Sequence, residues 1–381
     1  MSRELFNFNM MMAFIITYIL PTSIMPEIIG LRIDVIFFIL VIFFNLLYII
    51  AVDQKMKYWE LALLVFIALR VIFLKDFRAI VLFSIVIASR MTLAYSNNYK
   101  IMSEKKLKFV LMLSMIATMV YTVIFWGNFN RYAFTTYGEP NISSLSIFLL
   151  SVIIMKYYKR LGRLLMLFGF LTFSRSYMLA VFCFVFIPSM LNRPFTRRLY
   201  NTVTKNFFIV IVLISTLLVV LSSMFTSLYD QNLLMSSGAG LGRVLNILDY
   251  SNYLRFKVNT NLIELYISNP LKLLSGYETK EFIEQKILLS RSNGYYMTQI
   301  KPHNFFYSYL QSYGGFTVFI MYYISNIFKI LISKRNFALY VSIITYVTFL
   351  GTGLNSYFLI VSTIALMING KDENTWLMIS R

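Results

Sequence analysis

Charged residues, cysteine and histidine are all scarce in this chain of 381 residues. Only 13% of the residues are charged, about half the share of a soluble domain, whereas 59% are hydrophobic. With a mean hydropathy of +0.70, the composition predicts a protein of a membrane, because no water-soluble core absorbs so much apolar surface. The single cysteine, Cys183, excludes an intrachain disulfide.

Motifs of metal-dependent and nucleotide-dependent enzymes are also missing. The sequence has one histidine, no cluster of histidine and cysteine, and no phosphate-binding glycine loop. Acidic residues are few, and no Asp-x-Asp pair or catalytic triad is present in the predicted outer segments. Metal-assisted chemistry and nucleotide hydrolysis are therefore not expected, and no cofactor or metal is predicted.

Long apolar runs are abundant, and a membrane-crossing helix needs roughly 20 such residues. The run at 164–191 is divided in two at Ser174-Arg175, because an arginine in the middle of a span is costly. The twelve predicted spans lie at 8–29, 33–51, 58–74, 79–96, 109–126, 142–155, the two halves of 164–191, 206–225, 304–328, 337–353 and 356–370. The predicted fold is an all-α polytopic membrane protein with about 12 transmembrane helices.

The net charge of +19 would suit a polyanionic partner, but its distribution favours a membrane topology instead. With the N-terminus inside, about twenty Lys and Arg residues fall in predicted inner loops and about five in short outer loops. This asymmetry has the direction of the positive-inside rule. It predicts that both termini are cytoplasmic, and it requires no nucleic-acid partner.

The predicted organisation has three parts. Residues 1–225 form an N-terminal transmembrane bundle of about nine spans. Residues 226–303, the longest polar interval, form one large extracytoplasmic loop. Residues 304–381 form the C-terminal spans and a short cytoplasmic tail.

An amphipathic helix is predicted inside the large loop, at residues 251–268, and Asn269-Pro270 ends it. The apolar positions that recur at helical spacing are Leu254, Val258, Leu262 and Leu265 or Tyr266. Arg255 and Asn259 are four residues apart and share another face of this helix. Plain exposure to solvent would explain that second face equally well.

Among the residues near the ends of predicted spans, His303 and Arg175 are candidates for chemistry. His303 has a pKa suited to proton transfer near neutral pH, although it can also serve as a polar residue that opens a helix. Arg175 is interpreted as a cation in a polar pocket at membrane depth, or as an arginine that snorkels to the interface. Arg70 and Arg90 lie near the ends of predicted spans and are interpreted as snorkelling.

Four ordered elements carry a family resemblance. They are Pro140-Asn141; Phe173-Ser174-Arg175-Ser176; Arg255 followed by Asn269-Pro270 and Gly276; and His303-Asn304 followed by Gly314-Gly315. Their order and spacing resemble the O-antigen polymerase and O-antigen ligase superfamily of bacterial envelope glycosyltransferases. The chain departs from the family in two places: it lacks a tryptophan after Arg255, and it has Ser275-Gly276-Tyr277 in place of Gly-x-Gly. These departures concern the assignment to a subfamily more than the assignment to the superfamily.

The resemblance implies a GT-C-like, multi-pass enzyme of the cytoplasmic (inner) membrane. It would polymerise undecaprenyl-diphosphate-linked oligosaccharides at the outer face into O-antigen, capsule or exopolysaccharide, with the lipid diphosphate as leaving group. His303 would act as the base, while Arg175 and Arg255 would hold the diphosphate.

The resemblance also implies binding residues and partners. Substrate binding is assigned to Arg243, Asn259, Asn304, Asn141 and Arg131. The partners are the lipid-linked oligosaccharide and membrane lipid, with a chain-length regulator and a flippase as further candidates. Three alternative functions are a ligase of the same superfamily, a flippase or transporter of lipid-linked oligosaccharides, and a non-catalytic assembly protein.

Overall fold

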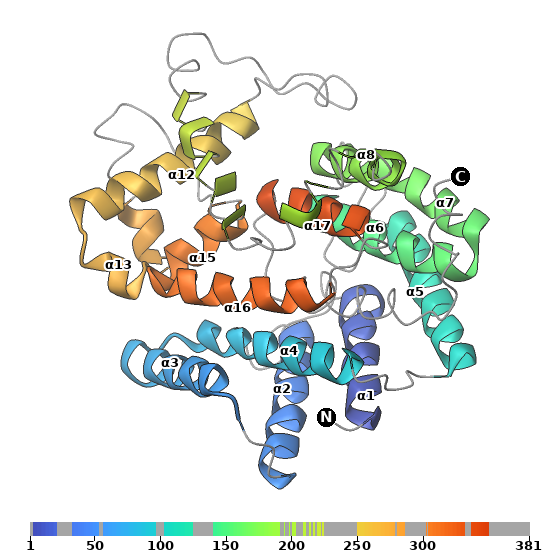
Figure 1. Cartoon of the computed structure of the whole chain (residues 1–381), viewed down its shortest axis with the longest axis horizontal. Coiled ribbons are helices and arrows are strands. Elements are labelled where there is room, and N and C mark those ends of the chain that lie inside the picture. The colour runs from blue at the N-terminus through green and yellow to red at the C-terminus, as the bar shows by residue number, and fades with distance from the viewer. Residues whose placement is uncertain are drawn as a thin grey trace. The chain divides into compact units, whose positions relative to one another are not determined.

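Helices are the regular structure of the described part of the chain (Figure 1). The computed structural model describes residues 3–20, 33–52, 56–96, 103–124, 140–190, 250–278, 280–285, 302, 304–331 and 337–349, with isolated helical positions between 194 and 224. The chain divides into two compact units, Met1–Thr172 with Gly353–Arg381, and Phe173–Thr352. The predicted boundaries at 225/226 and 303/304 stay predictions.

The first unit is built around one fully enclosed helix. Its elements are α1 (Arg3–Phe14) with a π-helical turn (Ile15–Ile19), α2 (Ile33–Ala51), α3 (Tyr58–Leu74), a 3-10 helix (Phe77–Leu82), α4 (Phe83–Ser96), α5 (Glu104–Ile124), α6 (Pro140–Tyr157), α7 (Lys159–Phe168) and a 3-10 turn (Gly169–Thr172). In α6, every side chain from Ser143 to Met155 is buried. A helix that is apolar on all sides belongs at the centre of a bundle, and α5 and α7 both contact it.

Two pairs of polar side chains connect helices in the interior of the first unit. Asn9 of α1 and Asn45 of α2 exchange amide hydrogen bonds of 2.9 and 2.7 Å. Arg90 of α4 donates to the buried carboxylate of Glu60 on α3 through Nη2 at 2.8 Å and Nε at 3.1 Å. These contacts join α1 to α2 and α3 to α4.

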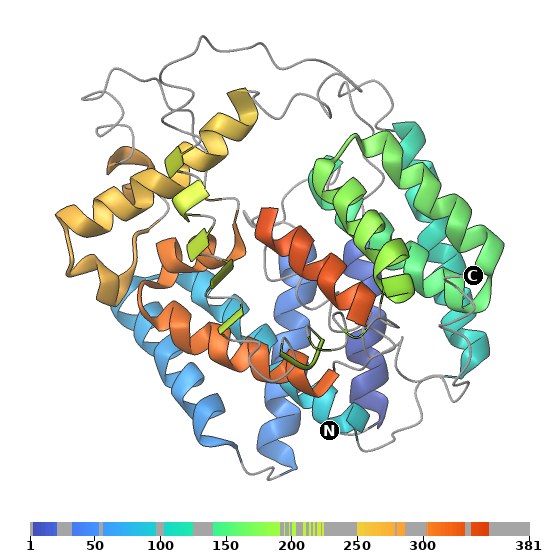
Figure 2. The same cartoon turned by 45° about the horizontal axis from the view of Figure 1, so that its top comes forward.

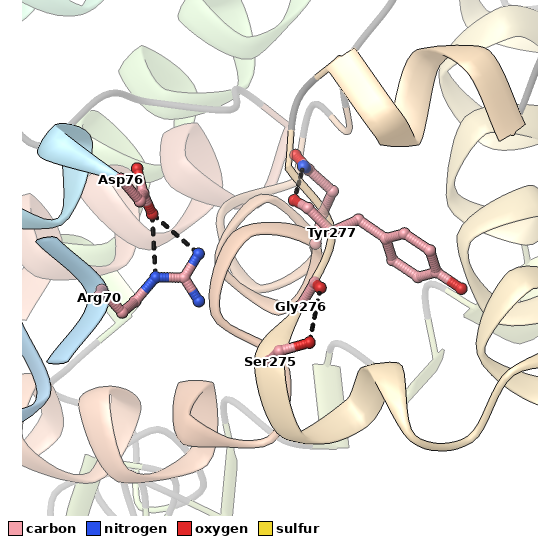
Figure 3. A network of polar contacts seen from close by, with 6 residues as sticks. Arg70, Asp76, Ser275, Gly276 and Tyr277 are labelled. Atoms are coloured by element: carbon pink, nitrogen blue, oxygen red, sulfur yellow. Dashed lines mark hydrogen bonds and ion pairs between the residues drawn. The ribbon is translucent and has the colours of Figure 1, made fainter. Parts of the chain in front are cut away.

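The interpretation of Arg70 and Arg90 as snorkelling residues is therefore wrong. Arg70 is only 5% exposed, and its guanidinium pairs with the Asp76 carboxylate at 2.8 Å (Figure 3). Arg90 pairs with Glu60. Arg70 lies near the end of α3, as the sequence indicates, whereas Arg90 lies in the middle of α4. Each has a carboxylate within reach and pairs with it.

The second unit is arranged around α15. Its described elements are α8 (Arg175–Met190), α12 (Tyr250–Ser268), α13 (Lys272–Ser275), α15 (Phe305–Tyr313), α16 (Phe316–Leu331) and α17 (Phe337–Phe349). Helix α15 contacts α12, α13, α16 and α17. Helices α8 and α17 lie side by side in both views, and the Ser342 hydroxyl donates to the Ala180 carbonyl at 2.7 Å (Figures 1 and 2).

The predicted architecture of about twelve transmembrane helices with a GT-C-like fold is wrong. Among the described residues, no helix has both the length and the apolar character that a membrane crossing requires. Breaks shorten several of the predicted spans. The span at 79–96 is a 3-10 helix followed by α4 of 14 residues, and the span at 304–328 is divided at Gly314 into α15 of 9 residues and α16 of 16.

Candidate functional site

Helix α12 places two predicted site residues, Arg255 and Asn259, one turn apart. The predicted helix at 251–268 is confirmed by α12, which runs from Tyr250 to Ser268. Of its predicted apolar positions, Val258, Leu262, Leu265 and Tyr266 are buried, the first two completely, and the side chain of Leu254 lies outside the described part. Because Pro270 has no N–H to donate, the helix ends just before it.

Asn259 is buried, so plain exposure to solvent does not explain this position of α12. Only 6% of the residue is exposed, and its Oδ1 has no hydrogen-bond partner among the described residues. A buried amide oxygen without a donor costs about 1–3 kcal/mol. Asn259 is therefore suited to accept a hydrogen bond from a bound molecule.

Two glycines let α13 and the junction of α15 and α16 cross at close range. Gly276 has φ +76° and Gly314 has φ +59°, in the left-handed region that favours glycine. A Cβ on Gly276 would lie 2.6 Å from the Ser312 carbonyl oxygen, and one on Gly314 would lie 2.8 Å from the Gly276 nitrogen. Next to them, the Gly315 N–H donates to the Leu273 carbonyl. The crossing joins the third and fourth elements of the family resemblance.

Reciprocal hydrogen bonds between Tyr277 and Gln311 stabilise this crossing. The Tyr277 N–H donates to the Gln311 carbonyl at 2.6 Å, and Gln311 Nε2 donates to the Tyr277 carbonyl at 2.8 Å. Figure 3 shows the Tyr277 ring pointing away from Gly276. Burial raises the pKa of the Tyr277 phenol, and the carboxylate of Glu281 raises it further. Tyr277 is therefore a neutral structural side chain near neutral pH.

Asn304 opens α15 and holds its first turn. Its side-chain oxygen accepts a hydrogen bond from the Tyr307 N–H at 3.1 Å, and the residue is 5% exposed. This is the N-cap arrangement that asparagine favours. Tyr307 packs in one apolar cluster with Val258 and Leu262, so the start of α15 is held against α12.

Arg175 begins α8, directly after a strained turn. Phe173 has φ +46°, and Ser174 is only 2% exposed. The predicted break at Ser174-Arg175 is confirmed, since a 3-10 turn ends at Thr172 and α8 starts at Arg175. Arg175 is half-buried. Its helix packs on α17, which in turn contacts α15.

Several predicted site residues fall outside this description. Arg131, Arg243 and His303 lie outside the described residues. Asn141 and Arg255 have helical backbone positions, in α6 and α12, but their side chains lie outside the described part. Asn141 belongs to the first unit, whereas Arg255 and Asn259 belong to the second. Within the described ranges, no group of His, Cys, Asp and Glu side chains is arranged to hold a metal ion.

The sequence gives no signal for the Tyr277–Gln311 contact, because nothing local distinguishes either residue. The burial of Asn259 did have a signal that we missed. Asn259 lies between the apolar positions Val258 and Leu262, at the edge of the face that packs inward.

No protein-family model, curated protein or solved structure matches this chain.

Proposed function

We propose that this chain is a polysaccharide polymerase, a glycosyltransferase that joins polyprenyl-diphosphate-linked repeat units at the outer face of the cytoplasmic membrane. One observation carries the proposal: the crossing of Gly276 with Gly314, two positions of the family resemblance that lie far apart in sequence. This crossing, together with the α12–α15 contact, holds the helix of Arg255 and Asn259 against the helix that follows His303.

In the proposed reaction, an acceptor hydroxyl oxygen attacks the anomeric carbon of the donor glycan. The new carbon–oxygen bond forms as the bond from that carbon to the diphosphate oxygen breaks. His303 takes the hydroxyl proton, and the electron pair leaves with the lipid diphosphate. Arg175 and Arg255 stabilise the leaving group, because guanidinium groups bind phosphate oxygens bidentately and preorganised charge lowers the barrier.

Asn259 has a defined place in this reaction. Its buried Oδ1 has no donor among the described residues, and a sugar hydroxyl is a donor of suitable size. We assign Asn259 to orienting one of the two glycans. Asn304, Asn141, Arg131 and Arg243 complete the proposed binding set.

A membrane location is supported by the outward-facing side chains of the first unit. Phe43 and Phe73 are 52% and 74% exposed, and Ile50 is 75% exposed. Large exposed apolar patches mark contacts with membranes or other proteins. A substrate that is carried on a polyprenyl lipid is reached at a membrane.

The test uses bacterial membranes that lack their own polymerase but contain the cognate lipid-linked repeat unit. They receive the native chain, His303→Ala, or the control Lys257→Ala, which removes a charge from α12 beside Arg255. The native chain and the control are expected to give a ladder of glycans on a gel. His303→Ala is expected to lose at least about 100-fold of this product, the contribution typical of a general base.

Each other outcome has a definite meaning. A full ladder from His303→Ala removes this residue as the base. A single capped species that requires a lipid A core indicates a ligase. Transfer of lipid-linked sugar across a liposome bilayer without a new glycosidic bond indicates a flippase. No product from the native chain with its cognate unit overturns the proposal.

A further inference from the structure

Basic residues gather where α5 begins and where α6 passes into α7. We call this set the basic collar: Lys105, Lys106 and Lys108 on α5, and Lys159, Arg160 and Arg163 on α7. Lys105, Lys106, Lys159, Arg160 and Arg163 are exposed. Glu104 is the one acidic residue in these helices, so the collar carries a strong local excess of positive charge.

Contacts with two tyrosines show that the two halves of the collar are neighbours. The Lys108 ammonium lies 5.7 Å from the ring centre of Tyr157 and 5.8 Å from that of Tyr158. Gly162 of α7 packs directly on Met155 of α6, which turns the chain back on itself at Tyr158. The start of α5, the end of α6 and the start of α7 therefore meet at one place in the first unit.

Charge and apolar surface are separated along the axes of α5 and α7. In α7 the exposed residues are basic up to Arg163, whereas Leu164, Leu167 and Phe168 are 55%, 63% and 49% exposed. In α5 the exposed face changes in the same way after Lys108, with Phe109 69% exposed. Both helices thus present cations first and apolar side chains afterwards.

This order matches the depth profile of one side of a phospholipid layer. Lysine and arginine near such a surface bind anionic headgroups, tyrosine favours the interface, and apolar side chains favour the acyl region. We infer that the basic collar is a binding site for anionic phospholipid headgroups, with the exposed apolar ends of α5 and α7 against the acyl chains. The inference lies in the first unit and does not rest on the proposed glycosyl transfer.

A nucleic acid would also be attracted by the charge, but it would not favour the exposed apolar residues next to it. Phe109 and Leu167 have no role on a phosphate backbone, whereas both are stabilised among acyl chains. The observations therefore favour lipid over nucleic acid as the partner.

The test uses the full-length chain purified in a neutral detergent. Phosphatidylglycerol or phosphatidylcholine with a fluorescent acyl chain is added to the micelles, and binding is read from the change in fluorescence. The variant is Lys105→Gln/Lys106→Gln/Arg160→Gln. The matched control is Lys75→Gln/Arg198→Gln/Lys280→Gln, which loses the same charge at exposed positions that do not belong to the collar.

The native chain and the control are expected to bind phosphatidylglycerol in preference to phosphatidylcholine, and added salt is expected to weaken the preference. The collar variant is expected to weaken phosphatidylglycerol binding by about tenfold or more, since each basic residue near an anionic surface contributes several-fold. Equal binding by all three proteins overturns the inference. An equal loss of phosphatidylglycerol binding in the control also overturns it. So does a collar variant that binds phosphatidylglycerol as the native chain does but loses binding to labelled single-stranded DNA.

Discussion

Glu60 and Arg90 show how charged side chains are accommodated in the interior of the first unit. Glu60 is 1% exposed, and its two carboxylate oxygens accept from two nitrogens of Arg90. The Lys57 N–H also donates to Glu60, at 3.0 Å. A buried carboxylate that accepts three hydrogen bonds is satisfied, whereas either partner alone would leave an uncompensated charge.

Glu60→Leu is expected to destabilise the chain by about 3 kcal/mol, because it leaves the Arg90 guanidinium largely buried without its partner. The double variant Glu60→Leu/Arg90→Met is expected to recover most of this loss, since apolar pairs often replace buried ion pairs at little cost. Thermal unfolding in detergent, followed by circular dichroism, measures both. If the single variant unfolds like the native chain, the pair does not stabilise the fold.

The crossing of α13 with α15 and α16 is the element that most depends on particular residues. Reciprocal hydrogen bonds between Tyr277 and Gln311 hold it on one side. The Tyr266 hydroxyl holds it on the other by donating to the Leu310 carbonyl at 2.5 Å. These hydrogen bonds fix α13 and α15 against α12, so the start of α15 lies beside α12.

Gly276→Ala is expected to destabilise the crossing by at least about 2 kcal/mol. The left-handed backbone costs an alanine about 1–2 kcal/mol, and its Cβ also meets the Ser312 backbone. The matched control is Gly315→Ala, whose Cβ would lie 3.2 Å from the Leu273 carbonyl oxygen, without a left-handed φ. Limited proteolysis between α12 and α15 is expected to speed up in Gly276→Ala and to change little in Gly315→Ala. Equal proteolysis rates would show that the crossing tolerates a side chain.

The first unit buries several polar side chains and exposes several large apolar ones. Polar side chains such as Asn9, Asn45 and Glu60 are buried, whereas Phe73 is 74% exposed and Ile50 75%. Apolar surface of this kind is stable only when something apolar covers it. Together with the net charge of +19, this distribution agrees with the proposed contact with lipid.

The purified chain is therefore expected to associate when detergent is removed. Sedimentation velocity with and without a neutral detergent measures this: a single species is expected above the critical micelle concentration, and large aggregates below it. Phe43→Gln/Leu47→Gln/Ile50→Gln, which makes part of the exposed face of α2 polar, is expected to reduce the aggregated fraction. A single small species without detergent would show that the exposed apolar side chains need no cover.

Local pattern was sufficient to predict some of these features but not others. Apolar spacing predicted α12 and its buried face, and the arginine inside an apolar run predicted the break before α8. Counting apolar residues predicted the bounds of α2 and α3, at 33–51 and 58–74, but not the helix lengths within 79–96 and 304–328. A run of apolar residues continues through a 3-10 turn or a glycine such as Gly314, whereas a helix does not.

The partners of the buried polar groups were decided by the tertiary structure alone. Nothing near Arg90 in sequence indicates Glu60, and nothing near Gly276 indicates Ser312. Helix periods and helix breakers act over a few residues, so a single sequence reveals them. A buried amide such as Asn259, a charge or a close glycine is explained by what packs against it from a distant segment, and that is known only when the chain has folded.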